Sequence, residues 1–185
     1  MFKSQLIDTF VVEKPDNISY INWLLTESYK KTSFFMAFPF FIYAVKSNKK
    51  EDEIESLKDV GKNIGILYQT GDDLFDMNDD IKTGTLALTY PLAYIMDNEE
   101  ILNNEEIKFI KKILEIKFLD TKNAKNLNSI YIKHKDVIND SAKDYFNEYF
   151  EKIKNSDQIN SNIKDIIIEL LQKIINPGFW QYRTL

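Results

Sequence analysis

The sequence predicts an all-α protein, and three observations support that fold class. Apolar residues recur at intervals of three and four over several long segments, which is the spacing of one face of an α-helix. No segment of useful length alternates apolar and polar residues as a half-buried strand does. Five glycines and four prolines in 185 residues are too few for a turn-rich β fold. We therefore expect a single helical domain over residues 1–185.

The expected helices follow one another along the whole chain. Residues 16–19 supply capping side chains, and Pro39 should kink or restart the helix that contains it. Residues 77–88 are expected to form a loop in which Gly84 is the permissive point. Residues 120–136 give the weakest pattern, with helix favoured over strand. The expected helical segments are residues 2–12, 18–43, 54–76, 88–96, 105–119, 140–154 and 163–175, the last one stopped by Asn176-Pro177-Gly178.

Composition and charge exclude several classes of protein. The formal net charge is −5, so no basic excess is present to neutralise the phosphates of a nucleic acid. Cysteine is absent, which excludes disulfides and thiolate metal sites. The first residues lack the pattern of a signal peptide, and the longest apolar run, residues 33–45, is too short to span a bilayer. A soluble, cytoplasmic protein without an integral membrane segment is expected.

One stretch interrupts an apolar helix face with acidic residues. At about 100° per residue, Gln69, Asp72, Asp73 and Asp76 fall within roughly a third of a turn of one another. Carboxylates at these spacings repel each other, and aspartate is a poor residue for a helix interior. A bound cation would offset the repulsion, and oxygen ligands suit Mg²⁺ above all. The stretch therefore indicates a Mg²⁺ site.

Other metal and catalytic patterns fit the sequence poorly. Residues 76–87 begin like an EF-hand loop, but Ile81 stands where glycine is needed and Ala87 where the bidentate glutamate should be. His134 is the only histidine, so neither a catalytic triad nor a zinc site can be built around it. We expect His134 to lie at the surface or at a helix end.

Four landmarks resemble the C-terminal half of the trans-isoprenyl diphosphate synthases, all-α enzymes that join isopentenyl diphosphate to an allylic diphosphate. Residues 65–76 match the second aspartate-rich motif of that family, Gly-x-x-x-Gln-x-x-Asp-Asp-x-x-Asp, at every named position. The other landmarks, in family order, are Gln5-Leu6-Ile7-Asp8 for a Gln-x-x-Asp, the Lys31-Thr32 pair, and Thr89-Tyr90-Pro91-Leu92 for a Thr-Leu-Pro. The resemblance implies a helical bundle that corresponds to the C-terminal half of the isoprenoid synthase fold.

The resemblance also implies a role for each matched residue. In the family, the acidic motif binds Mg²⁺ that grips a substrate diphosphate, and the lysine of the Lys-Thr pair contacts the same diphosphate. These charges stabilise the leaving diphosphate while an allylic cation forms. Aromatic residues after Lys31 are expected either to line an isoprenoid cavity or to pack in the core. The implied metal ligands are Asp72, Asp73 and Asp76, and the implied catalytic residues are Lys31, Thr32, Gln69, Asp72 and Asp73.

Two departures from the family pattern stand beside these matches. The family's first aspartate-rich motif is absent from the 185 residues. The loop after Asp76 lacks the Gly-Lys dipeptide that normally adds a phosphate contact, so Lys82 is its nearest stand-in, and Asp80 is a stand-in for a downstream acid. Arg183 is a further candidate for contact with the substrate diphosphate, the alternative being a frayed tail.

Three functions are consistent with these features. The leading one is half of a two-chain trans-prenyltransferase of isoprenoid biosynthesis. The sequence starts at Met1, only a few residues before the Gln5-Leu6-Ile7-Asp8 landmark, as expected for the product of a split gene. A separate N-terminal-half chain would then supply the first motif in a hetero-oligomer. The alternatives are a non-catalytic regulatory or binding relative and an unrelated helical interaction domain. Under the leading hypothesis we expect the lone chain to be unstable, because its helices would expose apolar faces.

Overall fold

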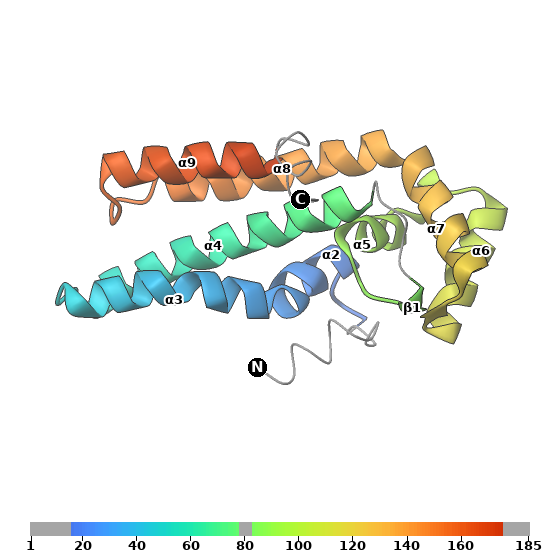
Figure 1. The fold of residues 1–185 in the computed structure, drawn as a ribbon, viewed down its shortest axis with the longest axis horizontal. Coiled ribbons are helices and arrows are strands. Elements are labelled where there is room, and N and C mark those ends of the chain that lie inside the picture. Colours follow the sequence, from blue (N-terminus) through green and yellow to red (C-terminus); the bar gives the residue numbers. More distant parts are fainter. Residues whose placement is uncertain (1–15, 78–82, 176–185) are drawn as a thin grey trace. The chain divides into compact units, whose positions relative to one another are not determined.

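Helices dominate the computed structural model, which describes residues 16–77 and 83–175 (Figure 1). The predicted all-α class is confirmed. The described α-helices are α2 (Tyr20–Trp23), α3 (Lys30–Lys46), α4 (Glu51–Asp76), α5 (Tyr90–Asp97), α6 (Asn104–Ile116), α7 (Thr121–Lys133), α8 (Lys135–Lys154) and α9 (Ser161–Ile175). They are joined by a π-helical turn, η1 (Leu24–Ser28), a 3-10 turn, η2 (Glu99–Ile101), and two short strands, β1 (Gly84–Thr85) and β2 (Phe118–Leu119). The helix expected over residues 2–12 and the stop at residues 176–178 lie outside the described residues.

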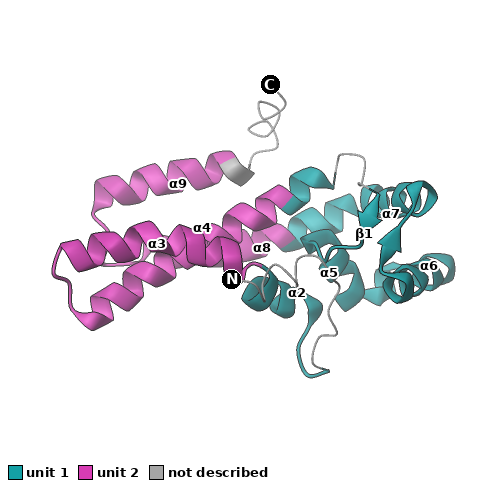
Figure 2. Cartoon of the chain, turned by 60° about the horizontal axis from the view of Figure 1, so that its bottom comes forward, with its two compact units in different colours: residues 1–28, 73–141 teal, residues 29–72, 142–185 magenta. Residues whose placement is uncertain are grey.

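The chain divides into two compact units, each built from two segments that are distant in sequence (Figure 2). Unit 1 comprises residues 1–28 and 73–141, and unit 2 comprises residues 29–72 and 142–185. The division falls within α4, directly after Asp72, and within α8, directly after Ser141. The single domain over residues 1–185 stays a prediction.

In unit 2, α3 and α4 approach each other closely through small residues. A Cβ atom placed on Gly61 would lie 2.5 Å from the Cα atom of Ala37, and one placed on Gly65 would lie 2.6 Å from the Cα atom of Ser33. Real Cβ atoms do not approach backbone atoms so closely, so glycine is required at both positions of α4. The sequence spacing predicts an apolar face of Ile54, Leu57, Gly61, Ile64 and Tyr68 on this helix. Leu57, Gly61 and Ile64 are buried, Ile54 and Tyr68 are half-buried, and Val60, Gly65 and Leu67 are buried as well.

In unit 1, α2 packs against α5, and the two helices are joined by a carboxylate. The Asp97 side chain at the end of α5 accepts hydrogen bonds from the backbone N–H groups of Tyr20 and Ile21, at 2.7 and 2.8 Å. Ser19 caps the same end of α2 by accepting from the Asn22 N–H at 3.1 Å. These bonds satisfy donors that the first turn of a helix leaves without an intrahelical partner.

The prediction over residues 77–88 and 105–119 was wrong in detail. The expected loop contains β1, which pairs antiparallel with β2, Gly84 lying opposite Leu119. The expected helix ends at Ile116 because Lys117 adopts a left-handed conformation with φ of 56°. Gly84 has a φ of +138°, which agrees with its predicted permissive role.

The single helix expected over residues 18–43 is also wrong, because η1 separates α2 from α3. Pro39 lies inside α3, and the helix does not restart there. A proline leaves the carbonyl four residues earlier, here that of Phe35, without its helical donor. Both residues are on the exposed part of α3, where water can satisfy that carbonyl. None of the described helices is both long and apolar enough to cross a bilayer.

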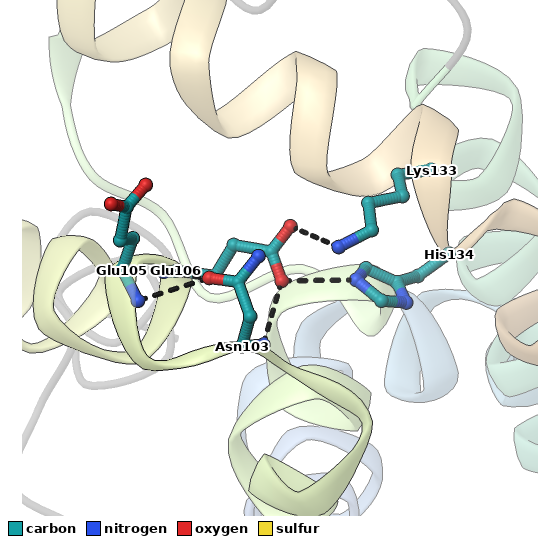
Figure 3. A network of polar contacts seen from close by, with 5 residues as sticks. All are labelled: Asn103, Glu105, Glu106, Lys133 and His134. Atoms are coloured by element: carbon teal, nitrogen blue, oxygen red, sulfur yellow. Dashed lines mark hydrogen bonds and ion pairs between the residues drawn. The ribbon is translucent and has the colours of Figure 1, made fainter.

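The contact between α6 and α7 is built around one carboxylate, that of Glu106 (Figure 3). Glu106 accepts from the Asn103 backbone N–H at 2.9 Å and from the Lys133 ammonium at 2.7 Å, and its other contact is with His134 Nε2 at 3.4 Å. Burial alone would raise the pKa of Glu106, but these three hydrogen bonds outweigh it and lower the pKa. His134 caps the C-terminal end of α7, which confirms the predicted helix-end position.

Candidate functional site

The acidic motif, residues 65–76, occupies about the last three turns of α4, which continues without interruption to Asp76. Its three carboxylates have different surroundings. Asp73 is buried, with 8 % of its surface exposed, Asp72 is half-buried, and Asp76 is exposed. The side chains predicted to act as one group of ligands therefore differ in their access to solvent and to a ligand.

A hydrogen bond joins two of the predicted catalytic residues within unit 2. The Thr32 hydroxyl near the start of α3 donates to the side-chain oxygen Oε1 of Gln69 on α4, at 3.0 Å. The two residues are 37 positions apart in the sequence, and each belongs to a different predicted landmark. The fold thus joins the Lys-Thr pair to the helix that carries the acidic motif.

Gly65, the first residue of the acidic motif, makes this hydrogen bond possible. A Cβ atom at residue 65 would lie 2.6 Å from the Ser33 Cα atom and 2.9 Å from the Thr32 carbonyl oxygen. Gln69 is four residues further along, so it lies on the same face of α4 one turn later. The close approach at Gly65 brings the start of α3 within hydrogen-bond range of Gln69.

In unit 1, Asp73 holds the N-terminal end of α5. Its Oδ2 atom accepts a hydrogen bond from the backbone N–H of Tyr90 at 2.7 Å. Thr89, the N-cap residue of α5, makes no side-chain capping bond, so the carboxylate of Asp73 supplies the anion that a helix N-terminus favours. The predicted acidic motif and the predicted Thr-Tyr-Pro-Leu landmark are therefore in direct contact.

Tyr131 of α7 completes the polar cluster around this contact. Its side chain is buried and hydrogen-bonds to the side chain of Thr89. Burial raises the pKa of the Tyr131 hydroxyl, and the negative charge of Asp73 raises it further, whereas the Thr89 bond acts in the opposite direction. Tyr131 was not predicted from the sequence, where no motif or periodic signal distinguishes it from a core tyrosine.

The donor set at the end of α4 fits magnesium that arrives together with a phosphate ligand. No group of three or more acidic or histidine side chains is close enough to hold a metal ion among residues 16–77 and 83–175. Mg²⁺, however, is usually bound by one or two carboxylates together with substrate phosphates and water. The carboxylates of Asp72 in unit 2 and of Asp76 in unit 1 are hard oxygen ligands of the kind that Mg²⁺ prefers.

Of the predicted phosphate contacts, the structure describes Lys31 and does not describe the others. Lys31 is exposed in the first turn of α3, next to Thr32. Lys82, Asp80, Arg183 and the landmark at residues 5–8 lie outside the described residues. Of the predicted site residues, the structure therefore brings Thr32 and Gln69 into contact, and it leaves the phosphate contacts as predictions.

Unit 2 also contains an apolar pocket of about 170 Å³. Pro39, Phe40 and Tyr43 of α3, Leu57 of α4 and Ile163 of α9 contribute to its lining. None of the predicted metal or phosphate ligands that the structure describes lines this pocket. Its chemistry suits a hydrocarbon group and not a diphosphate.

The family model described as polyprenyl synthetase matches residues 1–131, which is most of the chain. The chain belongs to the polyprenyl synthetase family. Within that match lie the Lys-Thr pair, the acidic motif and Tyr131, so the joined elements described above fall inside the family region. No curated protein matches the chain in full-sequence comparison.

A solved structure supports the fold of this chain. The chain is similar to the crystal structure of a decaprenyl diphosphate synthase from Rhodobacter capsulatus, with a TM-score of 0.68 and 15 % sequence identity. The similarity covers 94 % of this chain and 55 % of the synthase. The present chain therefore spans about half the length of the enzyme that it resembles.

Proposed function

We propose that this chain contributes the second metal–diphosphate site of a trans-prenyltransferase that condenses isopentenyl diphosphate with an allylic diphosphate. The observation that carries the proposal is the Thr32–Gln69 hydrogen bond, because it joins the Lys-Thr pair to the acidic helix. The proposed metal-side residues are Asp72, Asp73 and Asp76, and the proposed phosphate contacts are Lys31, Lys82 and Arg183.

Different residues of this chain would have different roles in binding a diphosphate. Mg²⁺, when bound, supplies positive charge that stabilises the leaving diphosphate. Asp72 and Asp76 of α4 would hold that charge, and the exposed Lys31 of α3 would add a cation. The Thr32–Gln69 bond orients the first turn of α3 and therefore the backbone that carries Lys31. Pre-positioned charges of this kind lower the barrier to loss of a leaving group.

We further propose that a second polypeptide supplies the complementary acidic motif, so that the active enzyme is a hetero-oligomer. Two features support this. The 185 residues contain one Asp-Asp-x-x-Asp sequence, at residues 72–76. The chain also aligns with only about half of the similar synthase.

A non-catalytic member of the family, which binds a diphosphate without transferring a prenyl group, is the second candidate. The observation that favours it is the position of Asp73, which is buried and bonded to the Tyr90 N–H. A carboxylate committed to a helix N-terminus has less capacity to ligate a metal ion. This role would retain Mg²⁺-dependent diphosphate binding and lack prenyl transfer.

Prenyl transfer from a reconstituted pair tests the proposal. The chain is co-expressed with a second chain from a neighbouring reading frame that carries its own helical Asp-Asp-x-x-Asp, and labelled isopentenyl diphosphate is supplied with an allylic diphosphate. We expect prenyl product from the pair and none from the pair that carries Asp72→Ala. Asp59→Ala, on the exposed side of α4, is the matched control and should retain activity. An inactive pair whose lone chain also fails to bind Mg²⁺-diphosphate would disprove the proposal.

A further inference from the structure

Helix α3 carries a stripe of large apolar side chains that no described part of unit 2 covers. Phe34 is 70 % exposed, Phe35 is 72 % exposed, and Phe38 is 53 % exposed. The Phe41 ring is partly covered by Lys58 of α4, whose Nζ atom lies 6.0 Å from the ring centroid. The apolar stripe, as we name it, consists of Phe34, Phe35, Phe38, Phe41, Ile42 and Val45.

The spacing of the apolar stripe is that of a helix-packing face. Phe34, Phe38, Phe41 and Val45 follow one another at intervals of four, three and four residues. Such intervals keep side chains on one side of a helix and allow them to interdigitate with a second helix. The buried residues of α3 are the small Ser33, Ala37 and Ala44, so this helix has its large residues outward and its small residues inward.

The area of the apolar stripe is that of a large surface patch of the kind that is often functional. With about 200 Å² for a phenylalanine, its four phenylalanines leave on the order of 450 Å² exposed, and Ile42 and Val45 add to this. The largest apolar patch of a typical monomer is about 300–600 Å² and often functional. One side of a standard protein–protein interface buries about 800 Å².

The charges of α3 select the kind of partner. Lys30 and Lys31 precede the apolar stripe, Lys46 follows it, and the helix has no acidic residue. Lys31 projects on the same side as the stripe, and Lys46 projects at its edge. A second copy would place lysine against lysine, because Lys31 would meet Lys31 in a parallel pair and Lys46 in an antiparallel pair. A helix with carboxylates at its ends would pair with these cations instead.

We infer that the apolar stripe docks an amphipathic helix of a second, non-identical chain, apolar in its middle and acidic at both ends. The inference rests on the proposed function, which requires a second chain, and it identifies where that chain binds. Helix-in-groove recognition of this kind depends on apolar anchors at helical spacing, with charges that set orientation and specificity.

A pair of synthetic peptides tests the inference on the whole chain. Each peptide is a labelled helix of about five turns with leucines at heptad spacing, ending in glutamates in one peptide and in lysines in the other. By fluorescence anisotropy we expect the glutamate-ended peptide to bind at least about tenfold more tightly. The Phe34→Glu/Phe38→Glu variant should lose this binding at least tenfold, and Lys46→Glu should reduce the preference between the two peptides.

Matched controls separate this inference from the proposed function. Ile166→Glu/Leu170→Glu makes the same chemical change on the exposed face of α9 and should leave peptide binding unchanged. Phe34→Glu/Phe38→Glu should retain the wild-type unfolding temperature and Mg²⁺-dependent binding of pyrophosphate. Equal binding of the two peptides, or equal loss in the α9 control, would overturn the inference. So would sedimentation of the chain as a dimer that Phe34→Glu/Phe38→Glu dissociates, because the occupant would then be a second copy.

Discussion

Gly65 determines how closely α3 and α4 approach, and its replacement should weaken both fold and site. Alanine is favoured over glycine in a helix by about 1 kcal/mol, but overpacking against backbone costs about 1–3 kcal/mol. The backbone of Ser33 would lie 2.6 Å from the new Cβ atom, so we expect Gly65→Ala to destabilise the protein. Urea unfolding measures the loss, and Asp59→Ala on the exposed side of α4 should change stability by less than about 0.5 kcal/mol. A stabilised Gly65→Ala variant would contradict this packing.

Asp73 has a structural role, because it accepts the hydrogen bond from the first N–H of α5. Asp73→Ala leaves the buried Tyr90 N–H without its acceptor, so we expect a loss of about 2 kcal/mol in the free energy of unfolding. Asp73→Asn keeps an oxygen acceptor and should lose less, about 1 kcal/mol. Asp76→Asn, at an exposed position, should leave stability nearly unchanged. Equal effects at residues 73 and 76 in thermal unfolding would contradict the assignment.

Glu106 makes the stability of unit 1 depend on pH. Its pKa is lower in the folded protein than its ordinary value of 4.5, so its contribution is present above that value and is lost as the pH falls through the folded pKa. We expect Glu106→Gln to cost about 1 kcal/mol at neutral pH and progressively less as the pH falls through the folded pKa of Glu106. Glu105→Gln in the same helical turn is the control. A difference that does not change with pH would contradict the prediction.

At the scale of elements, the sequence predicted the helices whose own residues carry the signal. The periodic face of α4 and the faces of α6 and α9 are legible because burial follows helical spacing. The end of α6 was missed because Lys117, and not a glycine, adopts the left-handed conformation that stops the helix. The strands were missed because two residues are too few to show alternation.

Pro39 was expected to kink or restart the helix that contains it, and its place inside α3 leads to a prediction. Proline in a helix interior removes a hydrogen bond and crowds the preceding turn. Because Pro39 is exposed, we expect Pro39→Ala to stabilise the protein by about 1 kcal/mol or more in thermal unfolding. Destabilisation by this substitution would mean that the proline ring packs usefully in the apolar pocket beside it.

At the scale of the whole molecule, the candidate site was predicted as a set of residues and not as an arrangement. The resemblance supplied the identities of Thr32, Gln69 and Asp73, but nothing in the sequence predicts that Thr32 donates to Gln69 or that Asp73 holds Tyr90. These contacts depend on folding across 37 and 17 residues. The division into two units, each of two segments, also could not be predicted from helical periodicity, because periodicity depends only on residues close together along one helix.

The central claim, that Lys31 of α3 and Asp72 of α4 help to hold a metal–diphosphate, is tested most directly by calorimetric titration of the lone chain with pyrophosphate. We expect binding that requires Mg²⁺, is weakened at least about tenfold by Asp72→Asn or Lys31→Ala, and is unchanged by Asp59→Asn. Thr32→Val should weaken it to a smaller extent, because Lys31 remains while the bond to Gln69 is lost. Binding that is absent, independent of Mg²⁺, or equally strong in Asp72→Asn would contradict the claim.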